Sequence, residues 1–205
     1  MAEPLVVANP VPSLKLDLAC GQSPREGFEG VDLLAPNAQH KVDLMKFPWP
    51  WADNSVLELH CSHFVEHIDC RTVEERDLAP GYRDSAVGKQ FIGKDMLFAF
   101  FDEAYRILVP GGHMQVIVPC GRSDRAFQDP THRRFFVQAT FAYLSRQWRE
   151  ANKLDHYRVQ CDFGSNIGHS MDSALNVLHP EVMSRKFNHE WNIVIDWIAN
   201  LVAIT

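Results

Sequence analysis

The sequence lacks any Cys-x-x-Cys pair and any apolar run long enough to cross a bilayer. Its five cysteines are an odd number and are scattered, which excludes a disulfide framework and a cysteine-type structural zinc site and suits a reducing compartment. The last apolar stretch, residues 191–204, is short and interrupted by polar residues. The first residues carry no signal-peptide pattern. We therefore expect a cytoplasmic protein with no membrane partner.

Basic charge is also scarce. The chain has 20 lysines and arginines against 26 aspartates and glutamates, which gives a net charge of −6. This balance excludes a broad phosphate-binding surface, so nucleic acid is not an expected partner. With 205 residues, of which 46% are hydrophobic, the chain suits a single domain over residues 1–205 with a core of its own.

Two short strands near the N-terminus carry the most informative pattern. Leucines alternate over residues 14–18 and predict a buried strand, which runs into a turn of small residues at 19–21. A second short strand, residues 30–33, brings in the acid Asp32. A strand, a small-residue turn and an acid after the next strand are typical of a nucleotide-cofactor site, where the acid accepts hydrogen bonds from a ribose.

Strand and helix patterns alternate further along the chain, which predicts an α/β fold with a mostly parallel sheet. The expected elements are an edge strand at residues 40–44, a strand at 56–61, a short helix at 62–68, a helix at 97–108, a strand at 113–119 and a C-terminal strand at 191–197. Residues 69–95 are polar and punctuated by glycine and proline. A loop of that length in a compact domain is usually functional or disordered, and we interpret it as a mobile lid.

Six segments follow one another in a characteristic order: residues 16–21, 30–32, 42–44, 47–55, 62–68 and 103–112. Together they resemble the class I S-adenosylmethionine-dependent methyltransferases of the small, single-domain type found in bacteria and phages. The resemblance implies a doubly wound, mostly parallel seven-stranded sheet of the Rossmann-like methyltransferase fold. It further implies an antiparallel last strand, helices on both faces, and S-adenosyl-L-methionine as cofactor.

The resemblance also implies a role for each residue at the cofactor site. Asp17 and the backbone of Ala19, Cys20 and Gly21 would face the methionine moiety, and Asp32 would take the ribose hydroxyls. Around the adenine would lie Leu33, Asp43 and Leu44. Beneath the methyl donor would lie Cys61, Ser62 and His63.

The chain departs from the family pattern in two ways. Ala19 and Ser23 stand where the family has glycines, so the turn is less permissive. About ten residues separate Gly21 from Asp32, fewer than a crossover helix needs, and the first helix is therefore predicted to be a stub.

The segment at residues 129–136 resembles a motif of one subgroup of this family and provides the expected acceptor contacts. Arg133 or Arg134 would hold an anionic acceptor, while Asp129 or His132 would accept a proton. The alternative is a charged turn that only braces the following helix.

The spacing His63-x-x-Glu66-His67 also matches a zinc-peptidase helix, in which two histidines bind the metal and the glutamate is the base. A zinc hydrolase is therefore one alternative, although the family regularly has a similar sequence at this point. In the preferred interpretation no metal is expected, and the candidate bases are His63, His132 and Glu66.

The function that this sequence favours is methyl transfer to an oxygen or nitrogen atom of a small-molecule or glycan-like acceptor. The sulfonium methyl is already activated, so such a protein mainly aligns the nucleophile with it and excludes water. The alternative from another class is a module that binds S-adenosylmethionine or a nucleotide without turnover.

Overall fold

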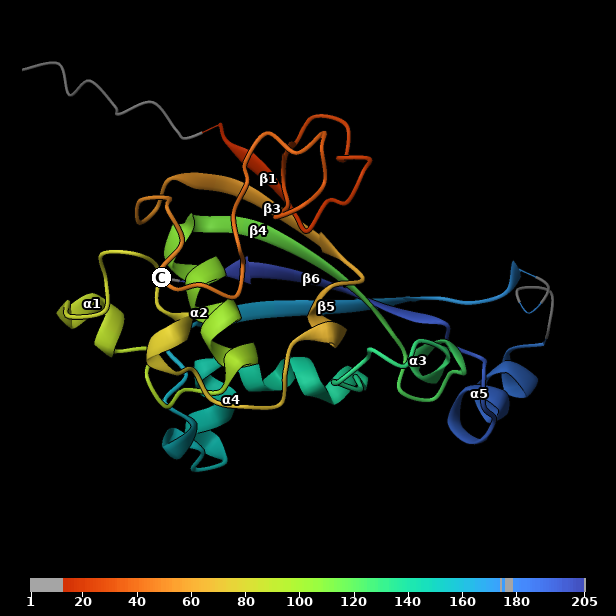
Figure 1. Ribbon diagram of the computed structural model, residues 1–205. Helices are drawn as coiled ribbons and strands as arrows, with labels where there is room; N and C mark the ends of the chain where they lie inside the picture. Colours follow the sequence, from red (N-terminus) through yellow and green to blue (C-terminus); the bar gives the residue numbers. More distant parts are fainter. Residues whose placement is uncertain (1–12, 174, 176–178, 205) are drawn as a thin grey trace, which may run out of the picture.

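The computed structural model describes residues 13–173, 175 and 179–204, which build a six-stranded sheet with helices (Figure 1). The strands are β1 (Lys15–Leu18), β2 (Glu29–Val31), β3 (Val56–Ser62), β4 (Leu108–Pro119), β5 (Phe163–Ser170) and β6 (Asp196–Ala203). The α-helices are α1 (Ala86–Lys89), α2 (Met96–Ile107), α3 (Arg125–Gln128), α4 (Arg146–Ala151) and α5 (Pro180–His189). Short 3-10 helices are η1 (Val65–His67), η2 (Glu75–Asp77), η3 (Gln138–Leu144) and η4 (Asp155–Tyr157). No helix in this part of the chain is long and apolar enough to cross a membrane.

The strands lie in the order β2-β1-β3-β4-β6-β5. The four strands β2, β1, β3 and β4 run parallel, whereas β6 is antiparallel to both of its neighbours. The α/β class, the mostly parallel sheet and the antiparallel direction of the last strand are confirmed. The last strand itself was predicted at residues 191–197 but begins at Asp196, since residues 191–195 are not in a strand. Because the first strands are parallel, their carboxyl ends meet at one edge of the sheet, which is where open α/β sheets bind ligands.

The described sheet has six strands, whereas the resemblance implies seven. The predicted edge strand at residues 40–44 is not formed, since the chain there pairs with β2 only through a single bridge between Val31 and His40. Asp43 then turns the chain, because its carboxylate accepts the N–H of Met45 at 2.9 Å. An aspartate side chain that bonds to the backbone two residues on competes with the backbone hydrogen bonds of a strand, which explains why no strand forms here.

The two faces of the sheet differ in character. One face carries buried apolar side chains that contribute to a continuous hydrophobic cluster: Leu16, Leu18, Leu59, Cys61, Met114, Val116, Val118, Ala199 and Leu201. Many of the intervening side chains are polar and at least partly exposed: Lys15, Glu58, His113, Gln115 and Asn200. In Figure 1 the helices α1, α2 and α4 lie on one side of the sheet. Helices on both faces are implied by the resemblance, but the described connections from β1 to β2 and from β2 to β3 are loops without an α-helix.

Helix α2 is the main support of the sheet. Asp95 caps it by accepting the N–H of Leu97 at 2.9 Å, and apolar residues recur at helical spacing behind the cap. Phe100, Phe101 and Ile107 are buried, and the chain passes from Ile107 directly into β4. The helix predicted at residues 97–108 is confirmed.

The segment at residues 69–95, predicted to be a mobile lid, packs against the core through three buried side chains. Leu78 and Val73 belong to the hydrophobic cluster, and the Phe91 ring stacks on Phe47 with the ring centroids 5.3 Å apart. Near its end, Lys94 forms a buried ion pair with Asp102 of α2. These contacts attach the segment to the hydrophobic core and to α2. Whether it moves as a lid stays a prediction.

Candidate functional site at the carboxyl edge of the sheet

The turn after β1 has the tight backbone that a nucleotide site needs. Ala19 and Gly21 both have positive φ angles, +54° and +59°. Gly30 of β2 lies so close to this turn that a Cβ there would be 2.7 Å from the Sγ of Cys20 and 2.8 Å from the Cγ of Pro24. The glycine is therefore required for the close approach of β2 to the turn.

Asp32 links the turn after β1 to the loop after β2. Its Oδ2 accepts the N–H of Gly21 at 3.1 Å, and its Oδ1 accepts those of Leu34 and Ala35, each at 2.8 Å. Burial alone would raise the pKa of Asp32, but these backbone donors, Ala35 first, hold it below the usual value. A carboxylate has about four acceptor positions, so three donors leave room for about one ligand hydroxyl, on Oδ2.

Asp17 is buried and is bonded on both oxygens. Oδ1 lies 2.7 Å from the Nδ1 of His60 on β3, and Oδ2 accepts the N–H of Arg25 at 2.8 Å. The ring of His60 also contacts Phe28, edge to face. Asp17 thus holds the returning loop of residues 22–28 onto the polar face of the sheet and lies beneath the turn that a ligand would meet.

The strained alanine gives a testable prediction. A left-handed backbone costs a non-glycine residue about 1–2 kcal/mol, while a glycine makes the unfolded chain more flexible at a cost of about 0.4–1 kcal/mol. We expect Ala19→Gly to raise the free energy of unfolding by about 0.5–1 kcal/mol in urea titrations. Ala151→Gly, in the exposed last turn of α4, is the matched control and should lower it. A less stable Ala19→Gly would show that the turn is not strained.

The other side chains expected around the cofactor divide into exposed and buried ones. Leu33 is 52% exposed beside Asp32 and offers an apolar surface. Leu44 and Cys61, in contrast, are buried in the hydrophobic cluster, so only their backbones could contact a ligand. Burial raises the pKa of the Cys61 thiol well above its usual value. Their placement beside the cofactor stays a prediction, and it would involve their backbones because both side chains lie in the hydrophobic cluster.

The end of β3 differs from the predicted helix at residues 62–68. Ser62 is still part of β3, His63 has a positive φ of +54°, and only the single turn η1 follows. His63 Nδ1 lies 3.3 Å from Oε1 of Glu66, and its Nε2 lies 3.3 Å from a nitrogen of Arg125. Because a guanidinium has no acceptor, Nε2 is the accepting nitrogen. His63 therefore lies outside the turn that carries His67, and the zinc-peptidase helix is not formed.

The segment at residues 129–134 is bound to η1. The N–H groups of Arg133 and Arg134 both donate to the carbonyl of Glu66, at 2.7 and 3.0 Å. The rings of His132 and His67 meet edge to face, with centroids 4.7 Å apart. Two segments far apart in the sequence thus bring four side chains together, which we name the polar cluster: His63, Glu66, His67 and His132.

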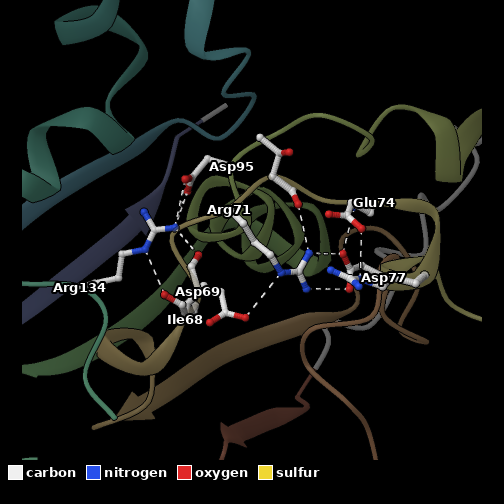
Figure 2. A network of polar contacts seen from close by, with 9 residues as sticks. Ile68, Asp69, Arg71, Glu74, Asp77, Asp95 and Arg134 are labelled. Atoms are coloured by element: carbon white, nitrogen blue, oxygen red, sulfur yellow. Dashed lines mark hydrogen bonds and ion pairs between the residues drawn. The ribbon is translucent and has the colours of Figure 1, made fainter. Parts of the chain in front are cut away.

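The arginines of this region are mostly committed to structure. Figure 2 shows Arg134 directed at the carbonyls of Ile68 and Asp69 and at the carboxylate of Asp95, the cap of α2. The same view shows the neighbouring pair of Arg71 and Asp77. Arg134 is therefore not available to hold an anionic acceptor, contrary to one of the two expected roles.

The other arginines between residues 121 and 149 also differ in whether their guanidinium groups are already bonded within the protein. Arg122 donates to carbonyls at the end of α5, and Arg125 pairs with Asp196 at 3.3 Å. Arg149 is buried and donates to three carbonyls. Arg133 is exposed, and its guanidinium makes no hydrogen bond or ion pair with the described residues. Of the two predicted anion ligands, only Arg133 remains available.

Sequence reasoning assigned no role to His60 as the partner of Asp17, nor to His67 as the neighbour of His132. His67 was visible in the pentad of residues 63–67, but nothing in the sequence indicates that it meets His132. The pairing of Asp17 with His60 depends on the register of two adjacent strands, which the structure shows and the sequence does not.

A hollow of about 380 Å³ lies elsewhere on the molecule, at the amino end of β4. Its charged lining residues are all paired: Arg106 with Glu103 and Asp53, at 2.7 and 2.6 Å, and Asp102 with Lys94. The chemistry-bearing residues lie instead at the carboxyl edge.

Comparisons with known proteins bear on the fold. No protein-family model matches the sequence, and no curated protein does. Among solved structures, a SAM-dependent methyltransferase from Archaeoglobus fulgidus is similar at a TM-score of 0.54, with 17% identity, over 93% of this chain and 86% of that one. A putative S-adenosylmethionine-dependent methyltransferase from Listeria monocytogenes is similar at a TM-score of 0.49, with 9% identity, over 97% and 94% of the two chains. Together with the strand order, the first likeness shows that the chain has the fold of the class I methyltransferases.

Proposed function

We propose that the protein binds S-adenosyl-L-methionine and transfers its methyl group to an oxygen or nitrogen atom of a small-molecule or glycan-like acceptor. The observation that carries the proposal is the position of Asp32. Its carboxylate joins the glycine turn after β1 to the loop after β2 and retains about one acceptor position. In this fold, the carboxyl ends of the first strands are where a ribose-containing ligand binds.

The chain's own residues would bind, orient and shield the reactants. Asp32 would take a ribose hydroxyl, and the exposed side chain of Leu33 would contact the adenine. The backbone of residues 19–21, with its left-handed turn, would lie against the methionine moiety. When bound, the cofactor supplies an activated methyl group, so alignment and exclusion of water are the main tasks left to the protein.

The acceptor side would be formed by the segment at residues 129–134 and its aromatic neighbours. Phe127, Phe135 and Trp191 flank this segment and are each about half exposed; Phe127 stacks on Phe135 with a centroid distance of 4.6 Å. Arg133, whose guanidinium is free, is two residues from Phe135 in the sequence, and flat apolar faces together with a free guanidinium suit a ring-shaped acceptor that carries an acidic group. Where the acceptor must lose a proton, His63, His132 and Glu66 of the polar cluster are the proposed acceptors of it, and His63 is the one that stays available if an ion occupies the other two.

The proposal is tested by methyl transfer itself. The purified protein is incubated with S-adenosylmethionine carrying a labelled methyl group and a panel of hydroxylated and aminated sugars and acids. S-adenosylhomocysteine and labelled product are then measured by mass spectrometry. We expect stoichiometric formation of both with at least one class of acceptor. Tight cofactor binding without S-adenosylhomocysteine across the panel would favour the binding module, and failure to bind the cofactor would refute both.

We also propose that the protein works in the cytoplasm. All five cysteines are free thiols in the structure, and three of them, Cys61, Cys120 and Cys161, are buried. Unpaired cysteines suit a reducing compartment.

A further inference from the structure

Glu66 is the most unusual side chain of the polar cluster. It is only 1% exposed, and no donor among the described residues makes a hydrogen bond with either of its carboxylate oxygens. Nδ1 of His63 lies 3.3 Å from Oε1, an ion-pair distance that supplies a charge only when the imidazole is protonated. A buried carboxylate without hydrogen bonds is costly unless a cation or a metal compensates it.

Two histidines turn a ring nitrogen toward this carboxylate. One carboxylate oxygen of Glu66 and one ring nitrogen from each of His67 and His132 all lie within 4.8 Å of one another. Ligand bonds of about 2.0–2.2 Å to one ion require separations of about 3–3.5 Å, so small side-chain rotations would close the site. Glu66 is buried while the two histidines are half-buried, which leaves one side open.

Both histidines are held in the tautomer that a metal ligand needs. His132 donates Nδ1–H to the carbonyl of Ala126 at 2.9 Å, so its Nε2 carries the free lone pair. Nδ1 of His67 lies 3.0 Å from Oγ1 of Thr131, whose single proton goes to Asp129 at 2.7 Å. The threonine must therefore accept from His67, which likewise leaves Nε2 free. Histidines that bind metals are typically oriented by such second hydrogen bonds.

The backbone fixes the two halves of the cluster relative to each other. Because the carbonyl of Glu66 accepts two N–H groups from Arg133 and Arg134, the position of His132 is tied to that of Glu66. The ligands thus come from two rigidly joined segments, as a preorganised site requires.

We propose that Glu66, His67 and His132 bind one divalent transition-metal ion, with zinc as the best fit, and leave a coordination position open to solvent or to an oxygen of a substrate. Imidazole nitrogens favour zinc, iron, cobalt or nickel over magnesium or calcium. Two histidines with one carboxylate and an open position are the donor set of catalytic rather than structural zinc sites. The site departs from the expectation that no metal is used, and it does not depend on methyl transfer.

The proposal is tested by metal binding without S-adenosylmethionine. The protein is stripped with a chelator and titrated with zinc by calorimetry, and bound metal is counted by mass spectrometry. We expect one zinc per chain, with Kd weakened at least about 100-fold in His67→Ala and His132→Ala and about 10–100-fold in Thr131→Val, which keeps all three ligands. His156→Ala, at an exposed histidine in η4, is the matched control and should bind as the wild type does.

Cobalt distinguishes the proposed ligands from the cysteines. Cobalt bound by two imidazoles and a carboxylate should show visible absorption without a near-ultraviolet thiolate charge-transfer band, and this spectrum should be lost in His132→Ala. Circular dichroism establishes that each variant is folded. A thiolate band, binding spread over several weak sites, or unchanged zinc affinity in folded His67→Ala and His132→Ala would overturn the proposal.

Discussion

Replacing Asp32 with alanine is expected to abolish binding of S-adenosylmethionine in calorimetric titrations. The substitution removes the carboxylate that would accept a ribose hydroxyl and also releases the N–H groups of Gly21, Leu34 and Ala35. A hydrogen bond to a charged group contributes about 1.5–3 kcal/mol, and the freed loops add to the loss. We expect Kd to rise by at least about 100-fold, which corresponds to about 2.7 kcal/mol.

Two further variants distinguish the ligand contact from the loop anchor. Asp32→Asn keeps the oxygen that accepts from Leu34 and Ala35, so its loop should stay in place while its affinity falls by a smaller factor. Asp84→Ala removes an exposed acid outside the site and should bind as the wild type does. Wild-type affinity in a folded Asp32→Ala protein would refute the assignment of the cofactor site.

Replacing Lys94 with methionine is expected to lower the free energy of unfolding by about 3–5 kcal/mol. Lys94 is buried against Asp102, whose Oδ1 also accepts the N–H groups of Gln160 and Cys161 at 2.9 and 2.8 Å. This carboxylate joins three parts of the chain: the segment at residues 69–95, helix α2 and the strand-leading residues before β5. Without the lysine, a buried charge is left uncompensated, and domains of this size have only about 5–15 kcal/mol of stability in total.

Urea and thermal unfolding provide the measurement, with two controls. Lys89→Met, at an exposed lysine of α1, should change the free energy of unfolding by less than about 0.5 kcal/mol. The double variant Lys94→Met with Asp102→Asn should be more stable than Lys94→Met alone, because it removes the unpaired charge and retains an oxygen for the two N–H groups. A loss below about 1 kcal/mol in Lys94→Met would contradict the role given to this ion pair.

The sequence predicted the elements whose local pattern and tertiary setting agree. The strand at residues 15–18 and the helix from Met96 were readable from periodicity and caps, whereas the C-terminal strand was predicted at residues 191–197 and forms at Asp196–Ala203. The predictions of local structure fail where a side-chain hydrogen bond or a left-handed residue interrupts regular backbone. Asp43 bonds to the chain two residues on and prevents a strand, and the left-handed His63 interrupts the expected helix after β3.

The alternation of residues along the strands also indicates how many faces of the sheet are covered by helices. A parallel sheet that is covered on both faces has nearly continuous apolar strands, whereas β3 and β4 alternate apolar and polar residues. The alternation of Glu58 and His60 with Leu59 and Cys61 indicates a strand packed on one side. The short connection after Gly21 points the same way, since a loop rather than a helix crosses from β1 to β2.

The polar cluster could not have been derived from sequence. It joins η1 to a segment more than sixty residues later through bonds between the Glu66 carbonyl and the N–H groups of Arg133 and Arg134. The arginine-rich composition of that region suggested an anion site. Composition does not reveal that the guanidinium groups of Arg134 and Arg149 donate hydrogen bonds to backbone carbonyls. Which cations are free is a property of the fold.

The polar face of the sheet also bears on how such a protein can diverge. Substitutions at water-facing positions usually change stability by less than about 0.5 kcal/mol, and Lys15, His113 and Asn200 occupy such positions on three different strands. Such water-facing positions are therefore freer to drift over generations than the residues between them, which are held by the core. A lineage built on such a sheet can lose most of its sequence identity and keep its architecture, which accords with a shared fold at 17% identity.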